Sequence, residues 1–466
     1  MGRFAGRLTR REPPSLNFVG LPMTYVPHTE EDVRAMLETI GVSSIDDLFV
    51  EIPENLRLKG ELDIPARLDE HQLMGHLKGL SERNLDLSRV ACFLGAGLYD
   101  RYIPASVGAV ISRGEFLTSY TPYQPEVSQG YLQTIYEFQT GIAEIYGCEI
   151  ANASMYDGPT SLAEGAIMAA GLQKSERIGV SACLHPHYRE VIETYCWSLG
   201  MEVREFPEVD GVTDWSAEIG ELGAVVAQYP NFYGVIEDLH AVRAAADRTG
   251  AKMVVSADPT ACGILPPPGA FGADIVTGEG QPLGIPIGFG GPMLGLFACK
   301  KEYARFIPGR IVGRTTDAEG RPGFTMTLRT REQDIRREKA TSNICTNEAL
   351  MALASTVYMA AVGKRGIRSV AESSVRNTQY AIQRLSEAGA KLRYPNRKVF
   401  CEFVLDLGRP AGPIRDALIE RGVLAGLPLG EVDPRRENEL LVAVTEVRTK
   451  AQIDQFADAL RQELAR

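Results

Sequence analysis

Short apolar runs alternate with amphipathic segments through the middle of this 466-residue chain. The apolar runs predict strands at 149–155, 177–184, 201–207, 223–230, 252–258, 273–278 and 294–299. Segments with apolar residues at helical spacing predict helices at 159–172, 187–200, 235–250 and 301–307. Strands that alternate with helical crossovers indicate a mainly parallel sheet with helices on both faces. Ligands of such sheets bind at the carboxyl ends of the strands.

The two ends of the chain have different patterns. Residues 29–41, TEEDVRAMLETIG, predict a helix with an N-capping threonine and a closing glycine. Shorter helices are expected at 43–49 and 69–84, and His71 and His76 of the latter are expected on a solvated surface. After residue 340, the pattern predicts a small α+β domain. Its helices are expected at 347–362, 373–389, 413–422 and 450–464, and its strands at 398–407, 423–429 and 439–446.

We therefore expect four parts along the chain. They are a flexible extension at 1–22, an N-terminal helical arm at 23–90, a large α/β domain at 91–340 and a small C-terminal α+β domain at 341–466. The first 22 residues carry four arginines and one glutamate. Because serine is sparse there and no long amphipathic pattern follows, we do not interpret them as a transit peptide.

Composition and charge exclude several classes of function. The net charge of −11 argues against nucleic acid or an anionic membrane as the main partner. No stretch approaches the roughly 20 apolar residues that span a bilayer. The eight cysteines are scattered singly without a C-x-x-C pair, which argues against a zinc site or a disulfide scaffold and favours a reducing cytoplasm. We predict no metal site.

The most informative stretch, 257–299, contains no lysine. Asp258 follows a predicted strand, where a carboxylate can hold the pyridine nitrogen of pyridoxal phosphate (PLP). A lysine further along would form the Schiff base with the PLP aldehyde, and that amine is missing here. A strand-end aspartate that caps the next turn explains Asp258 equally well. The chain thus has the pattern of half an active site.

Three further segments each allow two interpretations. Residues 278–292, GEGQPLGIPIGFGGP, form either a functional or interface loop or an irregular surface loop. Residues 152–166 lead into a helix N-terminus, which either binds phosphate or is capped by Thr160 with Glu164 behind it. Residues 119–130, SYTPYQPEVSQG, form either a stiff site wall or subunit contact, or a loop that covers the core.

Taken together, collinear segments of the chain resemble the P-protein family of the glycine cleavage system, in particular subunit 1 of its two-chain form. The segments that carry the resemblance are FLGAGLYDRYIPA, YTPYQPEVSQG, FQTGIAEIYG, NASMYDGPT, YPNFYGVIED, GEGQPLGIP and REKATSNICTNEAL. It begins at Met23 and runs nearly to the C-terminus. Cys401 departs from the family pattern, since that position is usually asparagine.

The resemblance implies the aspartate-aminotransferase-like fold of PLP-dependent transferases. It places Gln281 where the partner subunit carries its Schiff-base lysine, and an amide cannot form that bond. Asp258 and Thr160 would then belong to a relic of the cofactor site. We do not expect another lysine to replace the lost anchor. The three considered are Lys300, Lys301 and Lys339.

The resemblance also implies an activity, that of glycine decarboxylase. The complete enzyme binds glycine through PLP, releases carbon dioxide and transfers the aminomethyl group to the lipoyl arm of the H-protein. PLP is expected on subunit 2, in an α2β2 heterotetramer, and this chain would have no catalytic residue of its own. The residues expected to contribute to the partner's site or to the interface are Tyr99, Tyr120, Thr121, Tyr123 and Gln124.

Two other functions compete with this one. A self-sufficient PLP enzyme, such as an amino acid decarboxylase or a cysteine desulfurase, needs the lysine that residues 257–299 lack. A non-catalytic scaffold, which only stabilises the partner or docks the H-protein, is compatible with the missing lysine. The loop at 119–130 favours a contribution to a site over pure scaffolding.

Overall fold

The computed structural model of the protein describes residues 28–60 and 62–466, so the predicted extension at 1–22 lies outside them. The chain separates into two compact units, Met1–Asn84 and Leu85–Arg466. The predicted division at residues 90 and 340 stays a prediction. Among the described residues, no helix combines the length and the apolar character that crossing a membrane requires.

The described part of the first unit contains two α-helices. Helix α1 (Glu30–Ile40) begins with a capping box between Thr29 and Asp32 and ends at Gly41, whose φ of +85° is left-handed, as the sequence predicts. Helix α2 (Glu70–Ser81) carries His71 and His76 on an exposed surface. Short 3-10 turns lie between the helices, at Asp46–Phe49 and Glu54–Leu56. Neither α-helix contains a buried residue.

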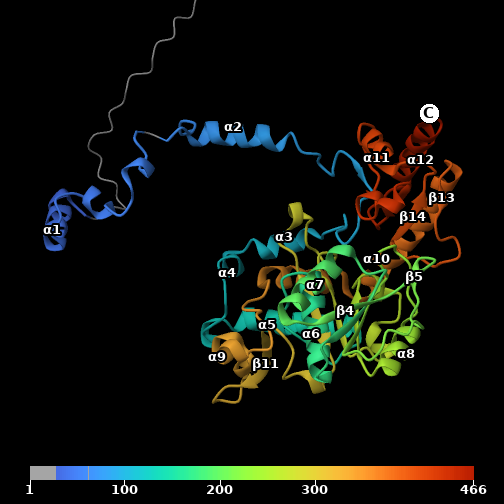
Figure 1. Ribbon diagram of the computed structural model, residues 1–466, viewed down its shortest axis with the longest axis horizontal. Coiled ribbons are helices and arrows are strands. Elements are labelled where there is room, and N and C mark those ends of the chain that lie inside the picture. The colour runs from blue at the N-terminus through green and yellow to red at the C-terminus, as the bar shows by residue number, and fades with distance from the viewer. Residues whose placement is uncertain (1–27, 61) are drawn as a thin grey trace, which may run out of the picture. The chain divides into compact units, whose positions relative to one another are not determined.

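A seven-stranded sheet forms the centre of the second unit, in the order β2-β10-β9-β8-β7-β3-β4 (Figure 1). The strands are β2 (Ile150–Ala151), β3 (Arg177–Ser181), β4 (Glu202–Phe206), β7 (Ala224–Tyr229), β8 (Lys252–Ala257), β9 (Ile275–Glu279) and β10 (Gly295–Cys299). Five of them, from β9 to β4, are parallel, whereas β10 runs antiparallel to both neighbours. The predicted mainly parallel sheet is confirmed.

Both faces of this sheet are buried, because successive residues of a strand point to opposite faces and pack in different cores. Val226 and Val254 pack in one core with helices α6 (Gly158–Gln173) and α7 (Pro186–Leu199). Val225 and Val255 pack in the other with α5 (Gln129–Tyr146) and α8 (Leu239–Thr249). Burial on both faces explains why the strands read as short continuous apolar runs.

A four-stranded sheet with its own helices forms the C-terminal part of the unit. The strands, in the order β13-β14-β17-β16, are β13 (Lys391–Leu392), β14 (Glu402–Asp406), β17 (Glu439–Ala443) and β16 (Leu427–Pro428), all antiparallel to their neighbours. The helices are α10 (Ala349–Glu387), α11 (Ala411–Ile419) and α12 (Lys450–Leu464). Phe403, Val442 and Phe456 lie in their shared core.

The segment at 91–102 connects this sheet to the site described below. Strand β1 (Ala91–Cys92) pairs in parallel with β15 (Val423–Leu424), and Ala443 of β17 donates a backbone hydrogen bond to Phe93. Arg101 forms an ion pair with Glu446, 2.8 Å between Nη1 and Oε2. The loop at 94–100 is therefore held at both ends against the C-terminal part of the chain.

Several elements differ from the predictions. The predicted helix at 301–307 is wrong, since only a 3-10 turn forms at Lys301–Tyr303. The two helices predicted at 347–362 and 373–389 are one element, α10, interrupted at Gly363 by a φ of +62°.

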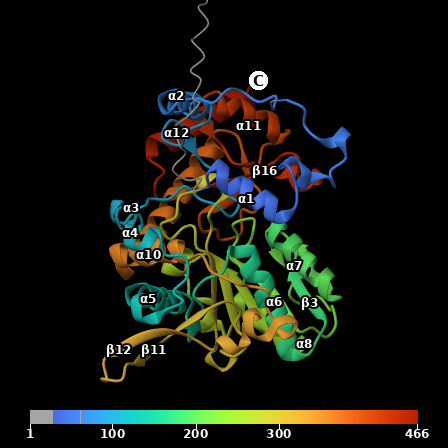
Figure 2. The same ribbon diagram turned by 90° about the vertical axis from the view of Figure 1, so that its left-hand side faces the viewer.

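Some elements were not predicted at all. The 18-residue helix α5 is one, and the hairpin of β11 (Ile311–Thr316) and β12 (Pro322–Thr327) is another. Figure 2 shows this hairpin beside α5. Gln129 at the start of α5 fixes it by exchanging hydrogen bonds with the Phe324 backbone, 2.9 Å to the carbonyl and 2.8 Å from the amide. Small helices and ladders complete the unit at α3 (Ala105–Ile111), α4 (Gly114–Leu117), α9 (Gln333–Arg336), β5 (Glu208–Val209) and β6 (Val212–Thr213).

Candidate functional site

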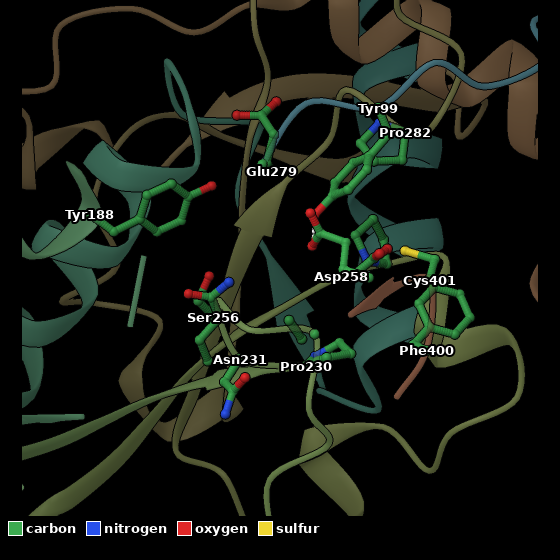
Figure 3. Close-up of a pocket in the computed structure, with 16 residues that line it drawn as sticks. Tyr99, Tyr188, Pro230, Asn231, Ser256, Asp258, Glu279, Pro282, Phe400 and Cys401 are labelled. Carbon is green, nitrogen blue, oxygen red and sulfur yellow. Dashed lines mark hydrogen bonds between the residues drawn. The ribbon is translucent and has the colours of Figure 1, made fainter. Parts of the chain in front are cut away.

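A cavity of about 50 Å³ lies at the carboxyl ends of the central strands, where an α/β sheet presents its ligand site. Strands β7, β8 and β9 contribute residues to its wall, and so do the loop that contains Tyr99 and the start of β14. Figure 3 shows the side chains of Tyr99, Tyr188, Asp258 and Glu279 around it. Its volume is far below the several hundred Å³ typical of a ligand pocket.

Gln281 follows strand β9 and is held by three hydrogen bonds. Its Oε1 accepts from the Tyr99 backbone N–H at 3.0 Å. Its Nε2 donates to the Tyr99 carbonyl at 3.0 Å and to the Ile285 carbonyl at 2.8 Å. The side chain is buried, with 2% exposure. An amide with all these bonds made has a structural role, and it leaves no amine at the position that the resemblance assigns to the lysine.

Asp258 combines features of both interpretations that the sequence left open. Its Oδ1 accepts backbone hydrogen bonds from Thr260 at 2.7 Å and Ala261 at 3.3 Å, so it caps the turn after β8. Its Oδ2 lies 3.8 Å from Nη2 of Arg101, a buried guanidinium, and the residue also lines the cavity. Oδ1 is thus occupied by the chain's own backbone donors, whereas Oδ2 is only within ion-pair distance of Arg101.

Glu402 is a second carboxylate at this cavity, on the C-terminal sheet. It accepts hydrogen bonds from the Tyr99 hydroxyl and from the Ala96 backbone N–H, both at 2.7 Å. Burial raises the pKa of Glu402 to about 7, and the two hydrogen bonds oppose that rise. Burial and the nearby Glu402 raise the pKa of the Tyr99 hydroxyl. Tyr99 and Glu402 therefore close one wall of the cavity together.

Glu279, at the end of β9, occupies the N-terminus of helix α6. Its Oε2 accepts from the Gly158 backbone N–H at 2.9 Å, and its Oε1 accepts from the backbones of Gln281 and Leu294, each at 3.0 Å. Burial raises the pKa of Glu279 to about 7, although these three donors counteract it. A helix N-terminus attracts anions, and here an internal carboxylate already fills that position.

The capping residue of α6 differs from the prediction. Asp157, not Thr160, is the N-cap, and its side chain accepts from the Thr160 backbone N–H at 2.8 Å. Thr160 instead lies in the first turn of the helix, and Glu164 behind it is buried. An aspartate outcompetes threonine here because Gly158 and Pro159 follow it directly, and proline is favoured in the first turn.

Pyridoxal phosphate does not fit this cavity. The volume is too small, and the carboxylate of Glu279 already occupies the start of α6, where a phosphate would bind. A phosphate group at the start of α6 would meet the carboxylates of Asp157 and Glu279. Since like charges repel strongly where water is excluded, the chain's own residues oppose cofactor binding at this place.

The residues predicted to serve a partner's site fall into two places. Tyr99 lines the cavity, next to Asp258 and in contact with Gln281. Tyr120, Tyr123 and Gln124 lie on a separate loop, with the Tyr120 side chain 74% and the Tyr123 side chain 63% exposed. Thr121 of that loop is half-buried and accepts a hydrogen bond from Arg310 at 3.2 Å.

Another exposed aromatic residue lies in the glycine-rich segment at 278–292. Phe289 is 94% exposed and adopts a left-handed backbone conformation, with φ +56°. An aromatic residue rarely takes this conformation, and an apolar ring in solvent has no favourable contact. The segment thus contains both Gln281, which is buried and held by hydrogen bonds, and Phe289, which is exposed to solvent.

The lysines considered as alternative anchors lie away from the cavity wall. Lys300 donates to Asp274 at 2.6 Å, an interaction that the sequence did not predict. Lys301 and Lys339 are exposed. Sequence reasoning also missed Arg101, Glu279 and Glu402. Only Glu279 left a signal, since it directly follows the predicted strand at 273–278 and lies in the glycine-rich segment.

Comparisons with known proteins agree with this architecture. The family model described as glycine cleavage system P-protein matches residues 23–460. A probable glycine dehydrogenase (decarboxylating) subunit 1 from Geobacillus kaustophilus is 50% identical over 440 residues, which cover 94% of this chain and 98% of that protein. A crystal structure of glycine decarboxylase (P-protein) of the glycine cleavage system, in inhibitor-bound form, is similar with a TM-score of 0.85 and 44% identity, and the match covers 94% of this chain and 100% of that one.

A more distant structure shows the fold class. Alanine–glyoxylate aminotransferase from Nostoc sp. has a TM-score of 0.56 at 16% identity, over 89% of this chain and 100% of that one. The predicted aspartate-aminotransferase-like fold of PLP-dependent transferases is thereby confirmed. With the match over nearly its whole length, the chain belongs to the glycine cleavage system P-protein family.

Proposed function

We propose that this chain is the subunit of a glycine decarboxylase that does not anchor the cofactor, and that it completes the active site of a second, lysine-bearing chain. The family match and the relatives named subunit 1 support an enzyme made of more than one kind of chain. The observation that carries the proposal is the side chain of Gln281, which is fully bonded to Tyr99 and Ile285 where an anchoring lysine would stand.

The proposed partner, subunit 2, holds pyridoxal phosphate. In that reaction the cofactor supplies the electron sink that lets carbon dioxide leave glycine. The aminomethyl group then passes to the lipoyl arm of the H-protein, which is a second partner. Among the described residues, no lysine lines the cavity wall, and Glu279 occupies the start of α6; both support placing the cofactor on the other chain. An α2β2 heterotetramer is the proposed assembly.

The exposed loop with Tyr120, Tyr123 and Gln124 is the proposed contribution to the partner's site. Exposed tyrosines in a proline-bearing loop offer large, rigid contact area at a low entropic cost. Thr121 accepts a hydrogen bond from Arg310, and this contact fixes the loop to the rest of the chain. We place Phe289 in the same interface, because a strained and exposed aromatic ring gains a great deal from burial against another chain. Tyr99 contributes by holding Gln281 and Glu402.

A cytoplasmic location is part of the proposal. Eight cysteines lie in the described residues, and all are free. Free thiols of this number suit a reducing compartment. The net charge of −11 fits small-molecule and protein partners better than nucleic acid or a membrane surface.

The test is a visible absorption spectrum of the purified chain with pyridoxal phosphate, alone and then mixed with subunit 2. We expect no absorption band that borohydride fixes on this chain alone, and glycine-dependent exchange of carbon dioxide only in the mixture. Covalent labelling of this chain by borohydride would contradict the proposal. So would full exchange activity of subunit 2 without this chain, which leaves only a scaffold role.

A further inference from the structure

Arg310 is a buried arginine that has no counter-ion among the described residues of this chain. Three arginines are less than 9% exposed, namely Arg101 at 7%, Arg448 at 6% and Arg310 at 8%. Arg101 pairs with Glu446 and Arg448 pairs with Asp100. Within residues 28–60 and 62–466, no salt bridge joins Arg310 to an aspartate or glutamate. A buried charge is unfavourable unless it is paired, so this guanidinium is a candidate for a counter-ion from outside the described residues.

Only one end of the guanidinium is bonded, and only to neutral groups. Its Nη1 donates to Thr121 Oγ1 at 3.2 Å, to Thr346 Oγ1 at 3.1 Å and to Asn347 Oδ1 at 3.4 Å. Its Nε and Nη2 have no acceptor among the described residues. Both atoms remain accessible to solvent, whereas Nε of Arg101 is buried. Two parallel N–H donors thus remain open, the arrangement that binds carboxylate or phosphate oxygens in a fork.

The surrounding segments hold this side chain in place before any ligand arrives. Arg310 directly precedes β11, and its carbonyl accepts a hydrogen bond from the Ala153 backbone at 2.8 Å. Asn347, just before α10, donates to the Ala153 carbonyl at 2.9 Å. Since the anchoring residues Thr121, Ala153, Thr346 and Asn347 come from three separate parts of the sequence, the donor fork is fixed by tertiary structure. A preorganised fork binds an anion without losing further side-chain freedom.

Glu332 is the candidate for an internal counter-ion of Arg310. Burial raises the pKa of Glu332, and the positive charges of nearby arginines, Arg310 among them, partly oppose that rise. In the part of the chain that the structure describes, no hydrogen bond or salt bridge joins the two side chains, and Oε1 of Glu332 is itself buried without a partner there. Glu332 therefore does not satisfy Arg310.

We propose that Arg310, with the hydroxyls of Thr121 and Thr346, is a binding site for an anionic group of the carboxylate or phosphate type. This inference rests on the proposed function for the identity of the anion, because Thr121 belongs to the loop assigned to the partner's site. The anion is then either the carboxylate of glycine or the phosphate of the cofactor, both held on the partner chain. None of these residues lines the cavity described above, so this is a separate site.

The first experiment uses the full chain alone, with inorganic phosphate and acetate as probes. Wild type is compared with Arg310→Gln and with a matched control, Arg321→Gln, at an exposed arginine on the turn of the same hairpin. We expect calorimetry to show phosphate binding for wild type and the control, weakened about tenfold or more in Arg310→Gln. Without phosphate, Arg310→Gln should melt at or above the wild-type temperature, because it removes an unpaired buried charge.

The second experiment uses the two-chain complex and separates the two sources of the anion. A cofactor phosphate predicts that Arg310→Gln raises the dissociation constant of pyridoxal phosphate, measured by equilibrium dialysis, with the KM for glycine unchanged. A glycine carboxylate predicts the reverse. Arg310→Lys keeps the charge but not the fork, so it should rescue only part of the affected constant.

Three results would overturn the inference. They are phosphate binding that is the same in Arg310→Gln and wild type, no phosphate binding by wild type together with both constants of the complex unchanged, or a melting temperature of Arg310→Gln that falls as far as that of Arg448→Gln. If the complex shows no glycine-dependent carbon dioxide exchange while phosphate binding still depends on Arg310, the proposed function fails and the anion site stands.

Discussion

The side-chain amide of Gln281 exchanges two hydrogen bonds with the backbone of Tyr99, each 3.0 Å long. An amide suits this position because it both accepts and donates, and the two backbone groups it meets need one of each. A lysine could satisfy only the carbonyl. The residue that replaces the anchor thus joins the glycine-rich segment to the Tyr99 loop, which gives it a structural role of its own.

Gln281→Lys should therefore not restore a cofactor site. The substitution leaves the part-buried Tyr99 N–H without its acceptor and places a cation at a position that is only 2% exposed. We expect a loss of about 2 kcal/mol in the free energy of unfolding and no covalent attachment of pyridoxal phosphate. Urea denaturation measures the first and mass spectrometry after borohydride the second. Labelling of the Gln281→Lys variant at the substituted position would show that the cavity can open to admit the cofactor.

Tyr123→Ala should lower turnover of the two-chain complex by about tenfold or more. The Tyr123 ring is exposed in the isolated chain and is proposed to line the partner's site. Tyr102→Ala is a matched control, since both side chains are 63% exposed and only Tyr123 lies on the proposed loop. Gel filtration checks assembly. Equal kinetics of the two variants, with intact complexes, would remove this loop from the site and favour a scaffold.

The buried Glu402 should make stability fall as pH rises. Below its ordinary pKa of 4.5 this group is protonated in both states, and between 4.5 and about 7 only the folded chain retains the proton. Wild type should thus lose on the order of 3 kcal/mol across this range relative to Glu402→Gln, whose amide cannot ionise. Glu420→Gln, at an exposed glutamate, is the control. Urea midpoints at several pH values test this, and parallel curves for wild type and Glu402→Gln would refute it.

Asp157→Ala and Thr160→Ala should differ in stability, because only Asp157 caps helix α6. We expect Asp157→Ala to reduce the free energy of unfolding by about 1 kcal/mol and Thr160→Ala to stay within about 0.5 kcal/mol of wild type. Chemical denaturation followed by circular dichroism measures both. An equal effect of the two substitutions would mean that the threonine side chain also stabilises the first turn.

The sequence predicts the layered α/β fold well because its strands are buried on both faces. Successive residues such as Val225 and Val226 enter different cores. Each strand is therefore a short apolar run that is easily recognised. Helix α1 is predictable residue by residue, since Thr29, Asp32 and Gly41 act locally. The hairpin of β11 and β12 is not, because it depends on Gln129, about 195 residues away from Phe324 along the chain.

The same distinction between local features and contacts distant in sequence applies to the candidate site. The missing lysine and the strand-end Asp258 are local features, and the sequence is enough to find them. Glu402 and Arg310 acquire their roles from burial and from partners distant in sequence, Tyr99 in one case and Thr121 in the other. No spacing rule connects such pairs. For the same reason, Tyr99 and Tyr123 were expected in one group, although the structure places only Tyr99 at the cavity.

Glu279 at the start of α6 has a consequence for biogenesis. A helix terminus that needs an external anion ties folding to the supply of that anion, because ligand binding stabilises a fold by mass action. Here the counter-charge is encoded in the chain and bonded to three backbone amides. Folding of this helix terminus therefore does not depend on the supply of an external anion such as the cofactor phosphate.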